Sequence, residues 1–295
     1  LAEQHNADGS FGSDRLLSGN VAVCALAGLA FLSEGSTTDR GDYAEHIRRC
    51  IGYIESHADP SGLLDNPDYQ SSGPMYGHGF GTLFLAEVYG MPDTDHLKSI
   101  LENAISLIVR SQNDEGGWRY QPVRKDADLS VTVCQMMALR AVRNAGFHVP
   151  ADTVDRCIDY VRRSQNPDGG FAYQLEGSRE SGFARTAAAI VTLNSAGVYE
   201  GDQLQRGLTW MITARPSPDD LDASYYYYGH YYAAQALWQV GDEPFRRWYP
   251  SVSDELTKLQ TRAGSWPSRY SPEYSTAMAL IVLQIPNNLV PIFQR

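Results

Sequence analysis

The chain has 295 residues, of which 43% are hydrophobic and 20% charged, a balance typical of a soluble globular protein. Its formal net charge of −11 argues against nucleic acid as a partner, because phosphate binding requires a basic surface. The sequence has no run of about eighteen apolar residues, so we expect no transmembrane segment. Nothing in it indicates the cellular compartment.

Apolar residues recur with helical spacing along most of the chain. Six segments are apolar nearly all round, like the run from Thr186 to Leu193, which is typical of helices packed on both sides. We expect these helices at about 18–34, 74–90, 129–145, 181–196, 223–240 and 272–285. The segments between them are amphipathic, with Leu101, Ile105 and Ile108 on one face of such a helix. We expect these second helices at about 41–57, 94–111, 151–164, 201–213 and 243–260.

A polar turn recurs before the buried helices. The segment Gln112 to Trp118 (QNDEGGW) returns as Gln165 to Phe171 (QNPDGGF), and weaker copies stand at 4–11, 59–63 and 260–266. The two full copies lie 53 residues apart, from Gln112 to Gln165. A repeat of this length indicates stacked helical hairpins, so we expect an all-α domain with an inner and an outer ring of helices. The expected repeat units of this single domain, 1–295, are about 1–58, 59–112, 113–164, 165–214, 215–260 and 261–295. Residues 1–4 resemble the last turn of an outer helix, whose start we expect to be missing.

The four cysteines lie far apart, each within an expected helix: Cys24, Cys50, Cys134 and Cys157. The sequence has no Cys-x-x-Cys pair and no cluster of cysteine and histidine with zinc spacing. We therefore expect reduced thiols in the core, and we predict neither a metal site nor another cofactor.

The repeated turn carries a family resemblance. Residues 108–118 and 160–171 resemble the QW motif of squalene and hopene cyclases. The resemblance extends over essentially the whole chain through the repeat, and it implies the α/α-toroid of the terpene cyclase and protein prenyltransferase superfamily. In physical terms, we expect the glutamine to cap a neighbouring helix and the aromatic residue to pack between hairpins. The motif therefore indicates the scaffold and leaves the chemistry open.

An acidic pair stands before the third buried helix. Class II terpene cyclases have an Asp-x-Asp-Asp motif at this place, and its middle acid protonates an alkene. This chain has Asp126 and Asp128, with Leu129 in place of the last acid. The resemblance implies that Asp128 is the proton donor and that Asp126 supports it. Neighbouring carboxylates favour the protonated acid, whereas the helix N-terminus favours the ionised one. The alternative is that Asp128 or Ser130 simply caps the helix.

Two histidines occupy equivalent positions in the repeat. His78 and His230 each precede a leucine by seven residues near the start of a buried helix. We expect both to face the central cavity, where one of them would orient the acid proton of Asp128. The alternative is that both are satisfied polar groups at helix starts.

The fifth repeat is rich in tyrosine, and further aromatic residues flank the other helix starts. An aromatic wall would bind an apolar isoprenoid and stabilise a carbocation through its ring faces. Filling of the core is the alternative for any one of these residues. The candidate ligand-binding residues are Tyr76, Phe80, Tyr227, Tyr228, Tyr231, Tyr274 and Arg185.

Other activities of this fold remain alternatives. Asp155 and Cys157 imitate the zinc ligands of protein prenyltransferases, but they lie in an expected outer helix, which argues against that activity. A carbohydrate-active α/α-barrel enzyme would pair Asp128 with Glu180 or Glu273, because glycosidases need two carboxylates. A non-catalytic toroid that binds an apolar ligand or a protein partner is the third hypothesis. We favour a terpene cyclase-like toroid with a central cavity and proton-initiated cyclisation.

Overall fold

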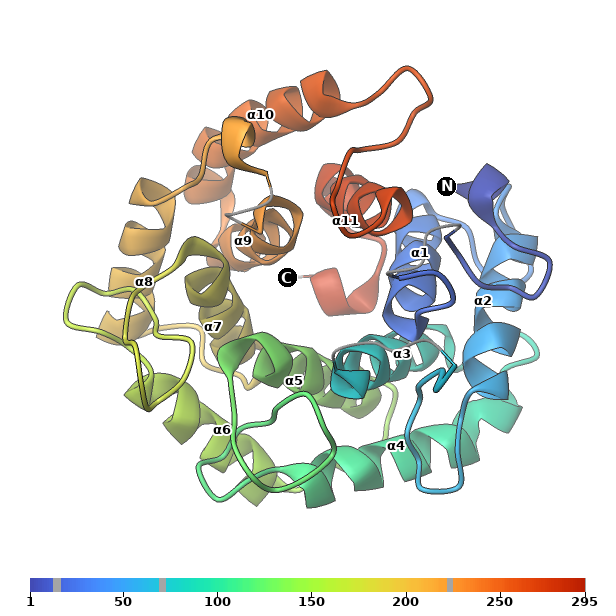
Figure 1. The fold of residues 1–295 in the computed structure, drawn as a ribbon, viewed down its shortest axis with the longest axis horizontal. Coiled ribbons are helices and arrows are strands. Elements are labelled where there is room, and N and C mark those ends of the chain that lie inside the picture. Colours follow the sequence, from blue (N-terminus) through green and yellow to red (C-terminus); the bar gives the residue numbers. More distant parts are fainter. Residues whose placement is uncertain (13–16, 69–72, 222–224, 295) are drawn as a thin grey trace.

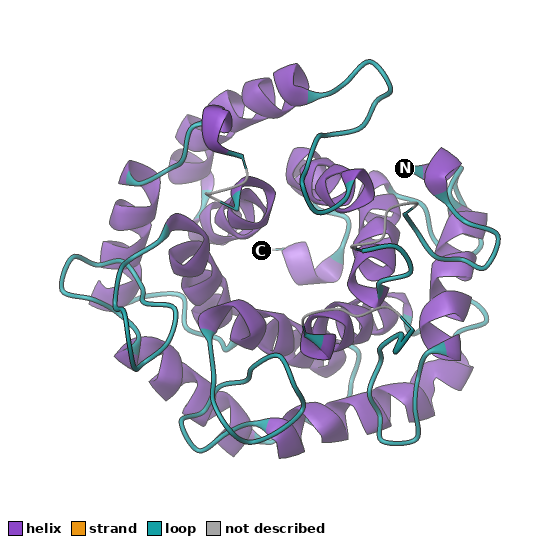
Figure 2. Ribbon diagram, in the orientation of Figure 1, coloured by secondary structure: helices purple, strands orange, loops and turns teal. Residues whose placement is uncertain are grey.

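The computed structural model describes residues 1–12, 17–68, 73–221 and 225–294, and apart from isolated bridges these residues form helices and loops. The helices form two concentric rings (Figures 1 and 2). The inner helices are α1 (Val21–Glu34), α3 (Pro74–Val88), α5 (Leu129–Asn144), α7 (Phe183–Ser195), α9 (Tyr226–Val240) and α11 (Pro272–Gln284). The outer helices are α2 (Ala44–Ser56), α4 (Lys98–Ser111), α6 (Ala151–Arg163), α8 (Asp202–Thr213) and α10 (Asp242–Leu259). The expected α/α-toroid is thus confirmed, and its helices lie within a few residues of the expected bounds.

The inner ring is closed. Each inner helix contacts the next, and α11 returns to contact α1. The outer helices α4, α6, α8 and α10 each contact their own inner helix and the following one, so they cover the seams between inner helices, and α2 contacts its own inner helix α1. This arrangement explains the sequence pattern, because a helix with neighbours on all sides has no solvent face on which to place polar residues.

The recurring turn joins each outer helix to the next inner helix. The backbone N–H of Trp118 donates to Thr132 Oγ1 on α5 at 3.1 Å, and its indole donates to the carbonyl of Ile108 at the end of α4 at 2.7 Å. Gly116 has φ of 100°, and a Cβ there would lie 2.1 Å from the backbone oxygen of Arg156. The turn therefore requires glycine at this point and an aromatic residue between the rings.

The motif glutamine plays a different part from the expected one. Gln112 Nε2 donates to the carbonyls of Gly116 at 2.8 Å and of Thr153, in the first turn of α6, at 2.9 Å. A helix cap would accept from N–H groups, whereas this amide donates to carbonyls. The expectation of a cap was wrong: the glutamine ties its own turn to the next outer helix.

The segment after α11 turns into the middle of the ring, where Figure 1 shows the C-terminal residues. It contains two short 3₁₀ helices, η4 (Ile285–Asn287) and η5 (Pro291–Phe293). Its second short helix, η5, contacts α5 on the far side of the ring, and Val290, Ile292 and Phe293 are buried. At the other terminus, Ala2–Gln4 form a short 3₁₀ helix, and the expected outer helix before it stays a prediction.

Candidate functional site

The N-termini of the inner helices meet at one mouth of the barrel. Trp118, Phe171 and Trp266, in three of the recurring turns, each donate their backbone N–H to a threonine in the inner helix that follows. These threonines, Thr132, Thr186 and Thr276, therefore mark one level of the barrel. His78 and His230 occupy the equivalent positions in α3 and α9. The residues two positions before these threonines and histidines keep accessible surface at this mouth: Tyr76, Ser130, Ala184, Tyr228 and Tyr274.

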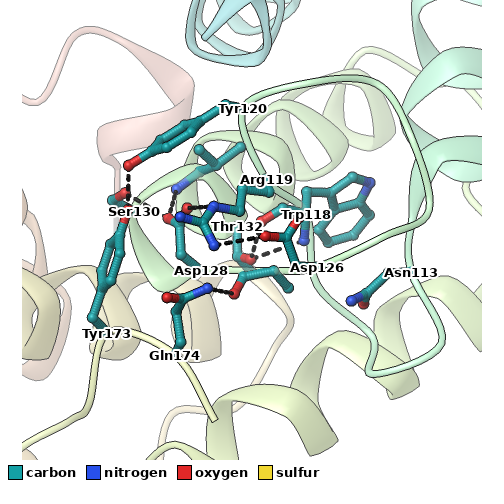
Figure 3. A network of polar contacts seen from close by, with 12 residues as sticks. Asn113, Trp118, Arg119, Tyr120, Asp126, Asp128, Ser130, Thr132, Tyr173 and Gln174 are labelled. Atoms are coloured by element: carbon teal, nitrogen blue, oxygen red, sulfur yellow. Dashed lines mark hydrogen bonds and ion pairs between the residues drawn. The ribbon is translucent and has the colours of Figure 1, made fainter. Parts of the chain in front are cut away.

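Asp128 is the N-cap of α5. Its Oδ1 accepts from the backbone N–H of Val131 at 2.9 Å and from the hydroxyl of Ser130 at 2.6 Å. Its side chain is fully buried, and Oδ2 has no hydrogen-bond partner among the described residues. The nearest cation to Oδ2 is Arg119, whose Nε lies 3.6 Å away (Figure 3). The expected cap is thus present, and it leaves one carboxylate oxygen without a donor.

Burial raises the pKa of Asp128, and its neighbours oppose this shift. The Ser130 hydroxyl, the Val131 N–H, the nearby Tyr173 hydroxyl and the Arg119 charge all lower the pKa, but burial outweighs them. Asp126 is half-exposed and forms an ion pair with Arg119 at 2.7 Å. The guanidinium therefore stands between the two carboxylates and reduces their mutual repulsion. In a pair of acids that shares a proton, by contrast, this repulsion is what holds the proton.

Phenol groups surround the cap. Tyr76 Oη lies 2.5 Å from Ser130 Oγ, and Tyr228 reaches across from α9 to donate to the backbone carbonyl of Ser130 at 2.7 Å. Tyr120 and Tyr173 hydrogen bond to each other through their hydroxyls beside the same cap (Figure 3). The mouth thus presents ring faces together with a network of hydroxyl groups.

The two histidines lie between the rings, so the expectation that they face the cavity was wrong. His78 Nδ1 accepts the backbone N–H of Leu64 at 3.2 Å, so it replaces the threonine of the other turns. His230 donates from Nδ1 to the carbonyl of Tyr226 at 2.8 Å and stacks on Trp248 of α10. Burial lowers the pKa of both histidines to about 4, which keeps them neutral. These interactions direct both rings toward the outer helices. The Nδ1 atom of each histidine is hydrogen-bonded, whereas the Nε2 atom of each is buried without a hydrogen-bond partner among the described residues, so the alternative of satisfied polar groups holds only in part.

Aromatic side chains lie inside the barrel below the mouth. Phe80 and Tyr231 make an edge-to-face contact with ring centroids 6.1 Å apart, and Phe293 meets Tyr231 from the C-terminal segment at 6.2 Å. Tyr232, also buried, lies with its hydroxyl 3.4 Å from Cys134 Sγ. Of the expected ligand-binding tyrosines, Tyr76, Tyr228 and Tyr274 keep accessible surface, whereas Tyr227 and Tyr231 are buried.

Two hollows among the described residues lie outside the barrel. One of about 400 Å³ lies beside α8 and includes Trp210, and another of about 250 Å³ includes Leu64 and Asn103. Inside the barrel, Phe80, Tyr231 and Phe293 are buried and joined by ring contacts, so they occupy the part of the central space where they meet. The expected central cavity stays a prediction. Arg185, half-buried in the first turn of α7, lies against Gly182, where a Cβ would come within 2.3 Å of its Nε.

The described residues contain no group of three or more histidine, cysteine, aspartate or glutamate side chains that would hold a metal ion. All four cysteines are buried free thiols. Within the described ranges, no helix combines the length and the hydropathy that crossing a bilayer requires.

Sequence reasoning missed the contribution of the residues after the motif. Tyr120 and Tyr173 stand two residues after Trp118 and Phe171, so the repeat places both at the same level of the barrel. The ion pair of Arg119 with Asp126, seven residues later in the same loop, was also not predicted. The repeat register was therefore the signal that would have found the two tyrosines.

A family model of the prenyltransferase alpha-alpha toroid domain matches residues 5–219. The chain belongs to this family. Drimenyl diphosphate synthase of Streptomyces showdoensis is 22% identical over 172 residues, which are 58% of this chain and 30% of that protein. The chain thus spans less than a third of that relative's length.

Solved structures share the fold. The type II terpene cyclase MstE from Scytonema, in complex with geranylgeranyl dihydroxybenzoate as substrate, is 14% identical with a TM-score of 0.65 over 96% of this chain and 92% of that one. Cellobiose 2-epimerase from Bacillus thermoamylovorans is 10% identical with a TM-score of 0.68 over 96% and 94%. At these identities the likeness shows the toroid and leaves the substrate class open. The chain is a terpene cyclase-like toroid.

Proposed function

We propose that this toroid binds an isoprenoid at the mouth of its inner ring and that Asp128 protonates an alkene of that ligand. The observation that carries the proposal is the state of the Asp128 carboxyl group. It is fully buried and its pKa is raised. Within the described part of the chain its Oδ2 has no hydrogen-bond donor, only the ion pair with Arg119 at 3.6 Å, and it lies near tyrosine rings that keep accessible surface. A buried acid with a perturbed pKa at a helix mouth is a candidate for acid catalysis.

The cap would stabilise the carboxylate after proton transfer. Oδ1 already receives the Val131 N–H and the Ser130 hydroxyl, so these donors need no rearrangement when the charge forms. The positive end of the α5 dipole and the Arg119 guanidinium act in the same direction. The rings of Tyr76 and Tyr228 would face the resulting carbocation, which aromatic faces attract.

A ligand-binding toroid without chemistry is the second candidate. Leu129 is buried in place of the last acid of the class II motif, and Arg119 is paired with both remaining carboxylates. The contact between Phe80 and Tyr231 inside the barrel also favours this candidate, because a cyclase must enclose its folded substrate. The carbohydrate alternative has a weaker basis, since Glu180 is exposed and Glu273, though buried, has no described link to Asp128.

The experiment compares the purified protein with its Asp128→Asn and Asp114→Asn variants. Each is incubated with geranylgeranyl diphosphate and with squalene, and products are identified by mass spectrometry. Asp114→Asn is the matched control, because it removes an exposed acid from the same loop that does not contact Arg119 or Asp128 among the described residues. We expect a cyclised product that disappears in Asp128→Asn and persists in Asp114→Asn.

Three results would redirect the proposal. Retention of either lipid without conversion would favour the ligand-binding toroid. Failure to bind either lipid, together with turnover of a disaccharide such as cellobiose, would move the function to carbohydrate chemistry. Equal product from the protein and from Asp128→Asn would remove Asp128 from the mechanism.

A further inference from the structure

The chain's own C-terminal segment occupies the end of the barrel opposite Asp128. Phe293 makes an edge-to-face contact with Tyr231 of α9, and both side chains are buried. Tyr231 in turn contacts Phe80 of α3 with centroids 6.1 Å apart. Phe293 belongs to no ring helix, because it lies in η5, and the segment after α11 turns into the middle of the ring (Figure 1).

We propose that residues 289–294 form a displaceable plug and that the space held by Ile292 and Phe293 is the binding site for the hydrocarbon end of the ligand. This proposal rests on the proposed function, since it assigns the depth of the same isoprenoid site. An isoprenoid that enters past the mouth layer meets Phe80, Tyr231 and Phe293, which are buried and joined by ring contacts. Ligand and plug then compete for one space.

Single hydrogen bonds and apolar burial hold the plug against the rings. Gln239 donates to the carbonyl of Gln294 at 2.6 Å, and the backbone N–H of Ile292 donates to the buried carboxyl group of Glu87 at 3.3 Å. Val290, Ile292 and Phe293 are also buried in the core. Just before the plug, Asn287 donates to the carbonyl of Ser33 at 3.1 Å. The plug is part of neither ring of helices, so it leaves without breaking either ring.

The backbone offers a hinge for this movement. Asn288 has φ of 54°, a left-handed conformation that asparagine adopts more readily than most residues, and it separates η4 from η5. Residues before it are fixed by α11 and by the bond to Ser33, whereas residues after it enter the barrel. Leu289 beside the hinge is 50% exposed, so it belongs to the segment but not to its buried part.

The test uses farnesol as the probe and measures amide hydrogen exchange in the unmodified protein. We expect farnesol to increase the exchange rate of the amides of Ile292 and Phe293 at least tenfold, because the plug must leave when the ligand enters. A paired binding titration compares the double variant Ile292→Ala/Phe293→Ala with Leu289→Ala as the matched control. We expect the double variant to bind farnesol at least tenfold more tightly, and the control to bind it like the unmodified protein.

Farnesol binding with unchanged or slower exchange in the segment would overturn the plug, and so would equal or absent binding in the double variant. The two proposals fail separately. Cyclised product from a protein whose segment never changes its exchange defeats the plug alone. Exchange that responds to farnesol in a protein that makes no product defeats the acid chemistry alone.

Discussion

Glu87 near the end of α3 is a buried carboxyl group whose ionisation opposes folding. Its side chain is 7% exposed, and burial raises its pKa from 4.5 to about 7, although the Ile292 N–H and the charge of Arg140 act in the opposite direction. The shift corresponds to about 3 kcal/mol, since one pKa unit is worth about 1.4 kcal/mol. We therefore expect Glu87→Gln to remove a penalty of this order.

The direction in which the free energy of unfolding changes with pH follows from proton binding by the folded and unfolded states. Between pH 4.5 and about 7 the folded protein keeps the Glu87 proton and the unfolded chain has lost it, so the free energy of unfolding falls as pH rises. Above about pH 7 the full penalty is present. Glu87→Gln should equal the unmodified protein near pH 4 and exceed its stability by up to about 3 kcal/mol at pH 8.

The assay is urea unfolding followed by circular dichroism between pH 4 and pH 8, with Glu102→Gln, an exposed change on α4, as the control. The difference between variant and unmodified protein isolates this group from the other acids. Parallel pH profiles for Glu87→Gln and the unmodified protein would refute the reasoning, because they would show that Glu87 is ionised in the folded state with no cost.

Two further changes test the recurring turn. Thr132→Val should cost about 1–3 kcal/mol, because it leaves the buried N–H of Trp118 without an acceptor, and Thr132→Ser should recover most of it; chemical unfolding measures both. Gly116→Ala should lower the unfolding free energy by more than about 2 kcal/mol, since its Cβ would overlap the Arg156 carbonyl, whereas Gly146→Ala, also at positive φ but in open space, should cost only about 1–2 kcal/mol. Equal losses at the two glycines would contradict the close-contact argument.

The ring architecture was predictable because its evidence is distributed along the chain. Glycines at 9, 62, 117 and 170 fix the repeat, and alternation of all-round apolar with amphipathic helices fixes which ring each helix joins. The direction of single side chains was less accessible. An inner helix that is apolar on every side gives no pattern by which to distinguish the central face from the outer one, so His78 and His230 were assigned to the wrong face.

The entry of the C-terminal segment into the middle of the ring was missed for a related reason. Residues after α11 have no helical periodicity, and their role depends on where the ring brings them rather than on their own pattern. Phe293 reaches Tyr231 although the two are far apart in sequence. The expectation of a cavity came from the ring alone, and it omitted a segment that has no counterpart in the other repeats.

Capping and acid catalysis are compatible roles for Asp128. A cap uses one carboxylate oxygen, and here Oδ1 takes both the Val131 N–H and the Ser130 hydroxyl. The donors that fix the side chain also stabilise the charge that proton loss would create, while Oδ2 stays without a donor. The deciding group is then Arg119, because its charge lowers the pKa that burial raises. A ligand that drew Arg119 toward Asp126 would strengthen the hold of Asp128 on its proton, and this is the role that the missing last acid of the motif would otherwise have filled.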